Sequence, residues 1–213
     1  SVYPTGATLF DPLRTWSGYT LFQATEHGAV LIDMNGNVVR EWPELHGFPN
    51  KMLPGGFILG HSGQRDPRYG MQDMVDLIQV DWEGNITWKF DHYEEINDPQ
   101  NPVRWMARAH HDYQRTGNPV GYYAPGLEPR TESGNTLILA HTNLINKDIS
   151  DKCLLDDTII EVNWAGEIIW EWRCSDHLMS SALLKQPEPQ YVTILICVPL
   201  TEEGATGCIS IKC

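Results

Sequence analysis

The sequence predicts an all-β protein made of repeated antiparallel units, and three recurring segments lead to this prediction. They are similar when aligned on Gly36, Gly84 and Gly166. In each, residues alternate between apolar and polar before and after a turn at the glycine, and the second stretch ends on an aromatic residue. Such alternation around a glycine turn is typical of a β-hairpin. The segments are Val30–Trp42, Ile78–Phe90 and Ile160–Trp172.

A further apolar stretch precedes each hairpin, so each unit is predicted to hold a strand followed by a hairpin. The aligned glycines are 48 and then 82 residues apart, and the first interval matches the roughly 40 to 50 residues of a propeller blade. The second interval therefore contains an insertion, which we place at residues 91–133. The predicted fold is a β-propeller of about three blades within residues 1–177. The blades are expected at residues 18–42, 55–90 and 134–172.

Three blades would leave the propeller incomplete, because a ring of this kind usually closes with about four to eight blades. Unpaired blade faces and strand edges favour association with other chains. We therefore expect this chain to be poorly stable alone or to self-associate, for example as a homodimer.

The last 36 residues, 178–213, differ in composition from the rest. All eight tryptophans and all eight histidines precede residue 178, whereas three of the five cysteines follow it. If the codons are regrouped so that each begins at the third base of the present codon, synonymous choices allow residues 178–186 to read D-E-F-G-F-A-E-A-A. They also allow residues 204–211 to read G-D-W-M-H-I-N. We hypothesise a frameshift after His177, which sequencing of the encoding DNA tests.

Composition and charge exclude some classes of protein. A formal net charge of −13 argues against binding to a nucleic-acid backbone, which requires clustered Lys and Arg. The longest apolar run, Val192–Leu200, is about half of what a membrane-spanning helix needs. No basic and apolar leader follows Ser1, so we expect any signal peptide to have been removed or to lie outside this sequence. The cysteines fit neither a disulfide framework nor a zinc site.

Two adjacent histidines, His110 and His111, are followed by Asp112 inside the predicted insertion. Imidazole serves as nucleophile, as acid or base and as metal ligand near neutral pH. From the residues alone, a solvated loop or a histidine bonded to backbone is the better explanation. Because successive strand residues point to opposite sides, the two rings are not expected to face the same side.

Together the three repeated units, the segment Phe48–Gly56, the His110-His111-Asp112 motif and the segment Leu155–Glu161 resemble the arylsulfotransferase family, the PAPS-independent aryl-sulfate sulfotransferases. The resemblance covers residues 1–177. It implies a six-bladed propeller with a central site, in which a histidine takes the sulfuryl group of an aryl sulfate and passes it to a phenol. It also implies an extracytoplasmic or periplasmic location and no cofactor.

The resemblance also suggests site residues. It makes His111 the main catalytic candidate, which would bind the sulfuryl oxygens or protonate the leaving oxygen, with His110 as a weaker candidate beside it. The family's D-W-x-H-x-N motif is absent as the tail is written, although the shifted reading restores it. The nucleophilic histidine of the family would lie beyond residue 213. We therefore expect the chain alone to be inactive.

Two more residues are candidates for substrate binding. Arg65 lies in a long loop and could offer a guanidinium to sulfate, although a salt bridge to one of the many carboxylates explains it equally well. His141 follows the strand predicted at Thr136–Ala140 and would point either into the channel or to solvent. We expect no metal site, because adjacent strand residues rarely bind one ion and no second cluster has a recognisable spacing.

Other interpretations of the pattern stay open. Trp42, Trp88, Trp170 and Trp172 recur at hairpin ends, so packing between blades explains them better than stacking on a phenol. A non-catalytic propeller that binds a ligand or protein is one alternative function. A quinoprotein is another, because Asp-x-x-Gly-x-x-x-Trp resembles the blade motif of pyrroloquinoline quinone dehydrogenases, but no calcium-ligand set accompanies it.

Overall fold

A computed structural model describes residues 9, 11, 13–63, 73–96, 102–117, 130–147, 151 and 153–178, and the backbone of two strands at 193–199 and 206–212. The described part is an all-β structure in which every pairing between strands is antiparallel. Its two short helical segments are a 3₁₀ turn at Pro54–Gly56 and α1 at Cys174–Leu178.

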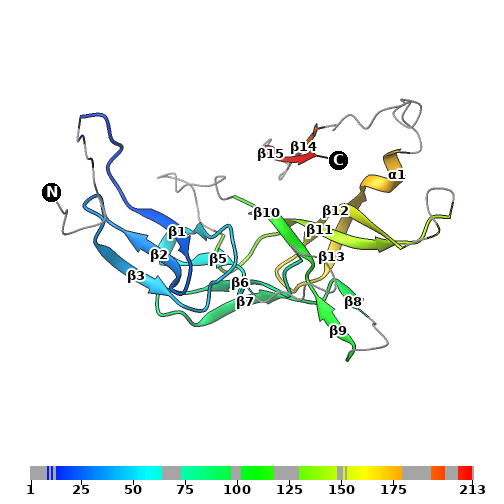
Figure 1. Ribbon diagram of the computed structural model, residues 1–213, viewed down its shortest axis with the longest axis horizontal. Coiled ribbons are helices and arrows are strands. Elements are labelled where there is room, and N and C mark those ends of the chain that lie inside the picture. Colours follow the sequence, from blue (N-terminus) through cyan, green and yellow to red (C-terminus); the bar gives the residue numbers. More distant parts are fainter. Residues whose placement is uncertain are drawn as a thin grey trace.

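Three larger sheets follow one another along the chain (Figure 1). The first sheet has the order β1–β2–β3, the second β4–β5–β6–β7 and the third β10–β11–β12–β13. The strands of the first sheet are β1 Thr20–Ala24, β2 Gly28–Ile32 and β3 Val38–Trp42. Those of the second are β4 Lys51–Met52, β5 Ile58–Gly60, β6 Leu77–Val80 and β7 Ile86–Phe90. Those of the third are β10 Ala109–Arg115, β11 Thr136–Leu144, β12 Leu154–Val162 and β13 Ile168–Arg173.

The last hairpin of each sheet closes with the same side-chain hydrogen bonds. A carboxylate or amide before the turn accepts the backbone N–H of the residue four positions on, and the two side chains also bond each other. The pairs are Asp33 with Asn37, Asp81 with Asn85 and Asn163 with Glu167. The glycine within each turn has a positive φ of 82°, 95° or 83°, which favours glycine there. The aligned residues thus form equivalent turns.

Four-stranded sheets arise because the chain adds a strand before the unit expected from the sequence. In the second sheet this strand is β4, and in the third it is β10, which belongs to the segment treated as an insertion. The same segment also forms a separate pair of strands, β8 Glu94–Ile96 and β9 Arg104–Met106. Near the C-terminus, β14 Thr193–Pro199 pairs with β15 Thr206–Lys212.

Two of the apolar clusters among the described residues pack between the larger sheets. One includes Trp42 and Ile78, and the other includes Trp88 and Ile138. The Trp42 indole N–H donates to the carbonyl of Asp81 at 3.1 Å, and the Trp88 indole N–H donates to the carbonyl of Trp164 at 2.9 Å. Each indole therefore links one sheet to the hairpin of the next, so these two tryptophans pack between sheets. Trp170 is 37% exposed, and Trp172 stacks on His177.

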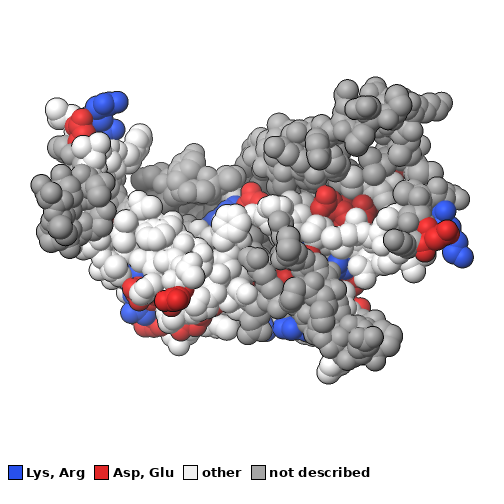
Figure 2. Space-filling view, viewed as in Figure 1, with Lys and Arg blue, Asp and Glu red and all other residues white. Residues whose placement is uncertain are grey.

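The charged side chains on the face drawn in Figure 2 form small separate groups among uncharged residues. Among the described residues, no helix is long and apolar enough to cross a membrane.

Candidate functional site

Neighbouring strands of the third sheet bring His110, His141 and Asp157 together. His141 on β11 lies opposite Asp157 on β12 in the antiparallel register. Ala109 on β10 lies opposite Ala140 on β11, so His110 and His141, which each follow one of these residues, lie on the same face of the sheet, where their rings stack. Three strands joined by backbone hydrogen bonds therefore position the three side chains, so their arrangement is set by the sheet.

The His-His-Asp motif forms a bulge at the start of β10. Between the pairs Ala109–Ala140 and Tyr113–Ile138, β10 has three residues where β11 has only Leu139. His111 adopts a positive φ of 55° within this bulge, a conformation uncommon for residues other than glycine. Bulges of this kind re-aim side chains and occur often beside functional sites. Here the bulge separates the two histidines, because His110 is 4% exposed whereas His111 is exposed.

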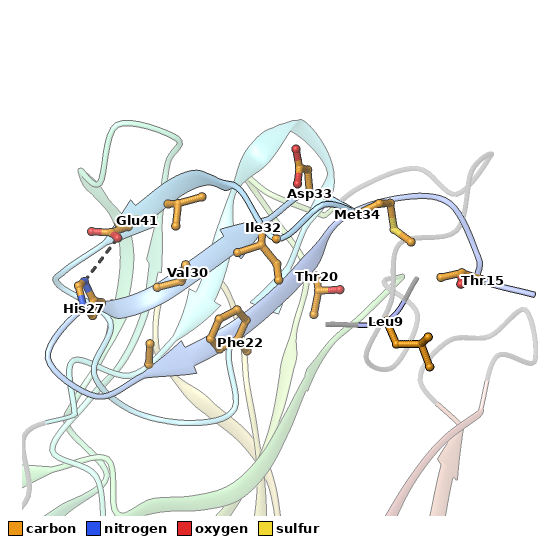
Figure 3. Close-up of a pocket in the computed structure, with 13 residues that line it drawn as sticks. Leu9, Thr15, Thr20, Phe22, His27, Val30, Ile32, Asp33, Met34 and Glu41 are labelled. Atoms are coloured by element: carbon orange, nitrogen blue, oxygen red, sulfur yellow. Dashed lines mark ion pairs between the residues drawn. The ribbon is translucent and has the colours of Figure 1, made fainter. Parts of the chain in front are cut away.

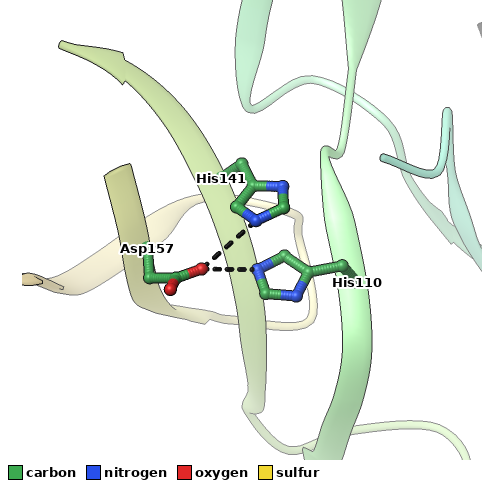
Figure 4. Close-up of side chains that lie close together, drawn as sticks. All are labelled: His110, His141 and Asp157. Carbon is green, nitrogen blue, oxygen red and sulfur yellow. Dashed lines mark ion pairs between the residues drawn. The ribbon is translucent and has the colours of Figure 1, made fainter. Parts of the chain in front are cut away.

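The rings of His110 and His141 stack over each other, with centroids 3.7 Å apart and planes at 18°. The Nε2 atom of each ring lies 3.2 Å from the same oxygen, Oδ1 of Asp157 (Figure 4). Although His110 is this close to Asp157, neither of its nitrogens makes a hydrogen bond of good geometry with a described residue. The three polar groups thus converge on one point from three strands.

Asp73 contacts the cluster through His141, and Arg108 in turn holds Asp73. Asp73 Oδ1 lies 2.5 Å from His141 Nδ1, and Asp73 Oδ2 accepts a hydrogen bond of 2.7 Å from Arg108 Nε. The Arg108 guanidinium also donates to Glu94 and Asn143. The side chains of Asp73 and Arg108 are both 0% exposed. Arg108 is thus linked through Asp73 to His141, in a buried chain of alternating charge.

Backbone contacts explain why Asp73 reaches this position. The N–H of Met74 donates to Ala109, and the N–H of Ala107 donates to Val75. The segment that follows Asp73 therefore runs beside the start of β10. The N–H of His141 donates to the carbonyl of Arg108 at 3.0 Å. This bond fixes the backbone of Arg108 next to that of His141.

The two stacked histidines have opposite pKa shifts. Burial, with a smaller contribution from the neighbouring histidines, lowers the pKa of His110 despite its contact with Asp157. Burial also opposes a charge on His141, but hydrogen bonds and charge from Asp157 and Asp73 outweigh it and raise its pKa to about 9. Burial likewise opposes the charge of Asp157, yet both histidines together lower its pKa. At neutral pH the metal-free cluster therefore pairs a neutral ring with a cationic one.

His111 and Asp112 complete the bulge on its exposed side. The His111 ring lies 5.2 Å from the His110 ring, between centroids. The Asp112 carboxylate lies 2.5 Å from Lys51 Nζ and accepts the N–H of Tyr113 at 2.8 Å. Asp112 therefore ties the bulge to β4, and its carboxylate pairs with Lys51 and the Tyr113 N–H rather than with either histidine.

The sequence candidates have different places in the structure. His110 and His141 belong to the buried cluster, and His111 lies at its exposed rim. Arg65 lies outside the described residues. Asp73, Arg108 and Asp157 were not singled out from the sequence, although Asp157 lies in the Leu155–Glu161 segment quoted above. The acidic pair Asp156-Asp157 inside the largely apolar stretch Leu154–Val162 was the available signal for Asp157.

A hollow on the first sheet is unrelated to this cluster. Its lining includes Phe22, Val30, Ile32 and the ion pair of His27 with Glu41, and its volume is about 580 Å³ (Figure 3). The lining is largely apolar, and the His27 and Glu41 side chains are 59% and 42% exposed. Solvent weakens such a pair, so the hollow lacks the buried, converging polar groups that distinguish the cluster on the third sheet.

Searches against family models, curated proteins and solved structures found no match to this chain.

Proposed function

We propose that this chain forms part of a β-propeller and contributes the sulfuryl-binding histidines of an arylsulfotransferase-type site. The observation that carries the proposal is the arrangement of the His-His-Asp bulge, with His110 stacked on His141 beneath an exposed His111. The successive sheets with equivalent hairpin turns and bridging tryptophans support the propeller.

Sulfuryl transfer requires donors for a group whose oxygens are negatively charged. His111 at the exposed rim meets the sulfuryl oxygens first, and the buried His110 ring and the half-buried His141 ring lie next to it in the stack. Asp73, itself held by Arg108, orients the His141 ring. In this assignment His111 binds substrate, and Asp73 is a positioning residue for His141.

In the proposed reaction an imidazole nitrogen attacks sulfur, and the N–S bond forms as the S–O bond to the aryl group breaks. The aryl oxygen takes a proton from a protonated imidazole of the site and leaves as a phenol. The acceptor phenol then attacks sulfur, loses its proton to a base, and releases the imidazole. The resemblance assigns the attack to a histidine beyond residue 213, so the described histidines serve binding and charge stabilisation.

The test is binding of 4-nitrophenyl sulfate to the chain in the presence of a metal chelator, measured by calorimetry. We expect His111→Ala and His110→Ala to weaken binding at least about tenfold, the loss of one charge-assisted hydrogen bond. His27→Ala is the control, because His27 is exposed on the first sheet. Equal binding by the wild-type chain and by His111→Ala refutes the assignment, as does equal affinity for 4-nitrophenol.

Transfer is measured separately, as release of 4-nitrophenolate in the presence of a phenol. The assay compares this chain with the full protein encoded by the alternative frame after His177 through to its stop codon, because the resemblance places the nucleophilic histidine beyond residue 213. Activity only in the alternative frame supports both the frameshift hypothesis and the proposed reaction. Binding without transfer in either protein favours the non-catalytic binding module.

A further inference from the structure

We propose that His110, His141 and Asp157 form a binding site for a divalent transition metal of the zinc class. One atom of each side chain could ligate an ion, and these atoms lie within 4.8 Å of one another. This inference goes beyond the proposed function, since it requires neither an aryl sulfate nor transfer.

The spacing of the ligand atoms fits a small tetrahedral site. Ligands about 2.1 Å from zinc at tetrahedral angles are about 3.4 Å apart. Each Nε2 atom lies 3.2 Å from Asp157 Oδ1, and both rings present this nitrogen to the same carboxylate (Figure 4). Because an imidazole binds a metal in its ring plane, the two stacked rings must tilt apart to direct both Nε2 atoms at one ion.

The unsatisfied ring of His110 is the second observation that points to a ligand. Its side chain is 4% exposed, and neither nitrogen has a hydrogen-bond partner of good geometry among the described residues. Buried polar groups are nearly always paired, and leaving one unpaired costs about 1–3 kcal/mol. A metal bound to Nε2 would satisfy the nitrogen that points into the cluster.

The surroundings of His141 match those of a metal-binding histidine. Such a ring almost always donates its other N–H to a carboxylate or carbonyl, which fixes its orientation. Asp73 Oδ1 lies 2.5 Å from His141 Nδ1, and Arg108 holds Asp73 from the other side. This leaves Nε2 of His141 facing Asp157 and His110.

Charge also favours a cation. The cluster and the residues that support it contain three carboxylates, of Asp73, Glu94 and Asp157, and one guanidinium, that of Arg108, which pairs with Asp73 and Glu94. With both imidazoles neutral, as metal ligands must be, a divalent ion brings the group to neutrality. Two nitrogen ligands and one oxygen suit zinc or cobalt better than magnesium or calcium, which prefer oxygen. Three protein ligands would leave a fourth position open.

The test uses Co²⁺ and Zn²⁺ with the whole chain after treatment with a chelator. We expect one Co²⁺ per chain, with visible bands of tetrahedral Co²⁺ and no thiolate band, and displacement by Zn²⁺. We expect His141→Ala to weaken binding more than about 100-fold, and Asp73→Asn, which alters the support of a ligand, by about 10- to 100-fold. His111→Ala should bind Co²⁺ like the wild-type chain, because His111 is outside the ligand set.

Circular dichroism establishes that each variant is folded. Where a ligand variant does not fold, its binding measurement is replaced by proton NMR of the Co²⁺-loaded wild-type chain. We expect two paramagnetically shifted imidazole signals in that spectrum. Absence of stoichiometric binding, a thiolate band, or wild-type affinity in a folded His141→Ala variant overturns the proposal. The two proposals fail separately, since His111→Ala is expected to lose the aryl sulfate and keep the metal.

Discussion

Replacing Arg108 by methionine should destabilise the chain strongly. Arg108 and Asp73 are both 0% exposed and joined by a 2.7 Å hydrogen bond, and the same guanidinium also bonds Glu94 and Asn143. Methionine keeps much of the side-chain volume but leaves the Asp73 carboxylate buried without its guanidinium partner. Removing one partner of a buried ion pair costs about 3–5 kcal/mol. For a chain of this size that corresponds to a fall in Tm of roughly 6–20 °C.

Thermal and urea unfolding, followed by circular dichroism, measure the effect. Arg173→Met is the matched control, because Arg173 pairs with Glu171 at 3.2 Å on the surface, where both side chains are partly exposed, and an exposed pair contributes about 0–1 kcal/mol. The double variant Arg108→Met with Asp73→Asn should recover part of the loss, since it also removes the carboxylate that has lost its guanidinium partner. A loss in Arg108→Met no greater than in Arg173→Met would refute the account of the buried ion pair.

Three further substitutions test the fold by urea unfolding. Trp88→Phe removes the 2.9 Å hydrogen bond to the Trp164 carbonyl and should cost about 1 kcal/mol, a prediction that fails if the variant is as stable as the wild type. Tyr113→Phe leaves the Leu59 carbonyl without the 2.8 Å bond from a fully buried hydroxyl and should cost about 1–3 kcal/mol; an unchanged midpoint contradicts it. In Gly166→Ala the added Cβ meets no atom within 4 Å, but Gly166 has a φ of +83°. Backbone strain alone should therefore cost about 1–2 kcal/mol. An unchanged stability contradicts this and shows that the turn adapts.

Local patterns allowed the hairpins to be predicted. The turn residues act within five positions of one another, as in Asp33 with Asn37, so their chemistry can be read directly from the sequence. Alternation then assigned the strands on both sides. The strands β4 and β10 were missed because β4 has only two residues and β10 contains a bulge, so neither shows a regular alternation.

The candidate site could be predicted only in part, because its members are distant along the chain. Asp73 and His141 are separated by 68 residues, and no spacing rule connects them. The proximity of Arg108 to Asp73 depends on backbone bonds between the segment at Met74 and β10. A single sequence offers no sign of such a pairing, whereas the histidine pair itself was visible at once.

The bulge also explains why the alternation of side chains along a strand was a poor guide to the roles of His110 and His111. Alternation predicts that adjacent rings face opposite sides but does not say which side holds the partners. Residues 110–112 of β10 lie opposite Leu139 alone, and His111 adopts a φ of 55°. The bulge thus presses the His110 ring against His141 and turns His111 outward. The motif therefore divides into a buried histidine, His110, which we propose as a metal ligand, and an exposed one, His111, which lies outside the proposed ligand set, so His111→Ala is the substitution expected to separate the two proposed activities.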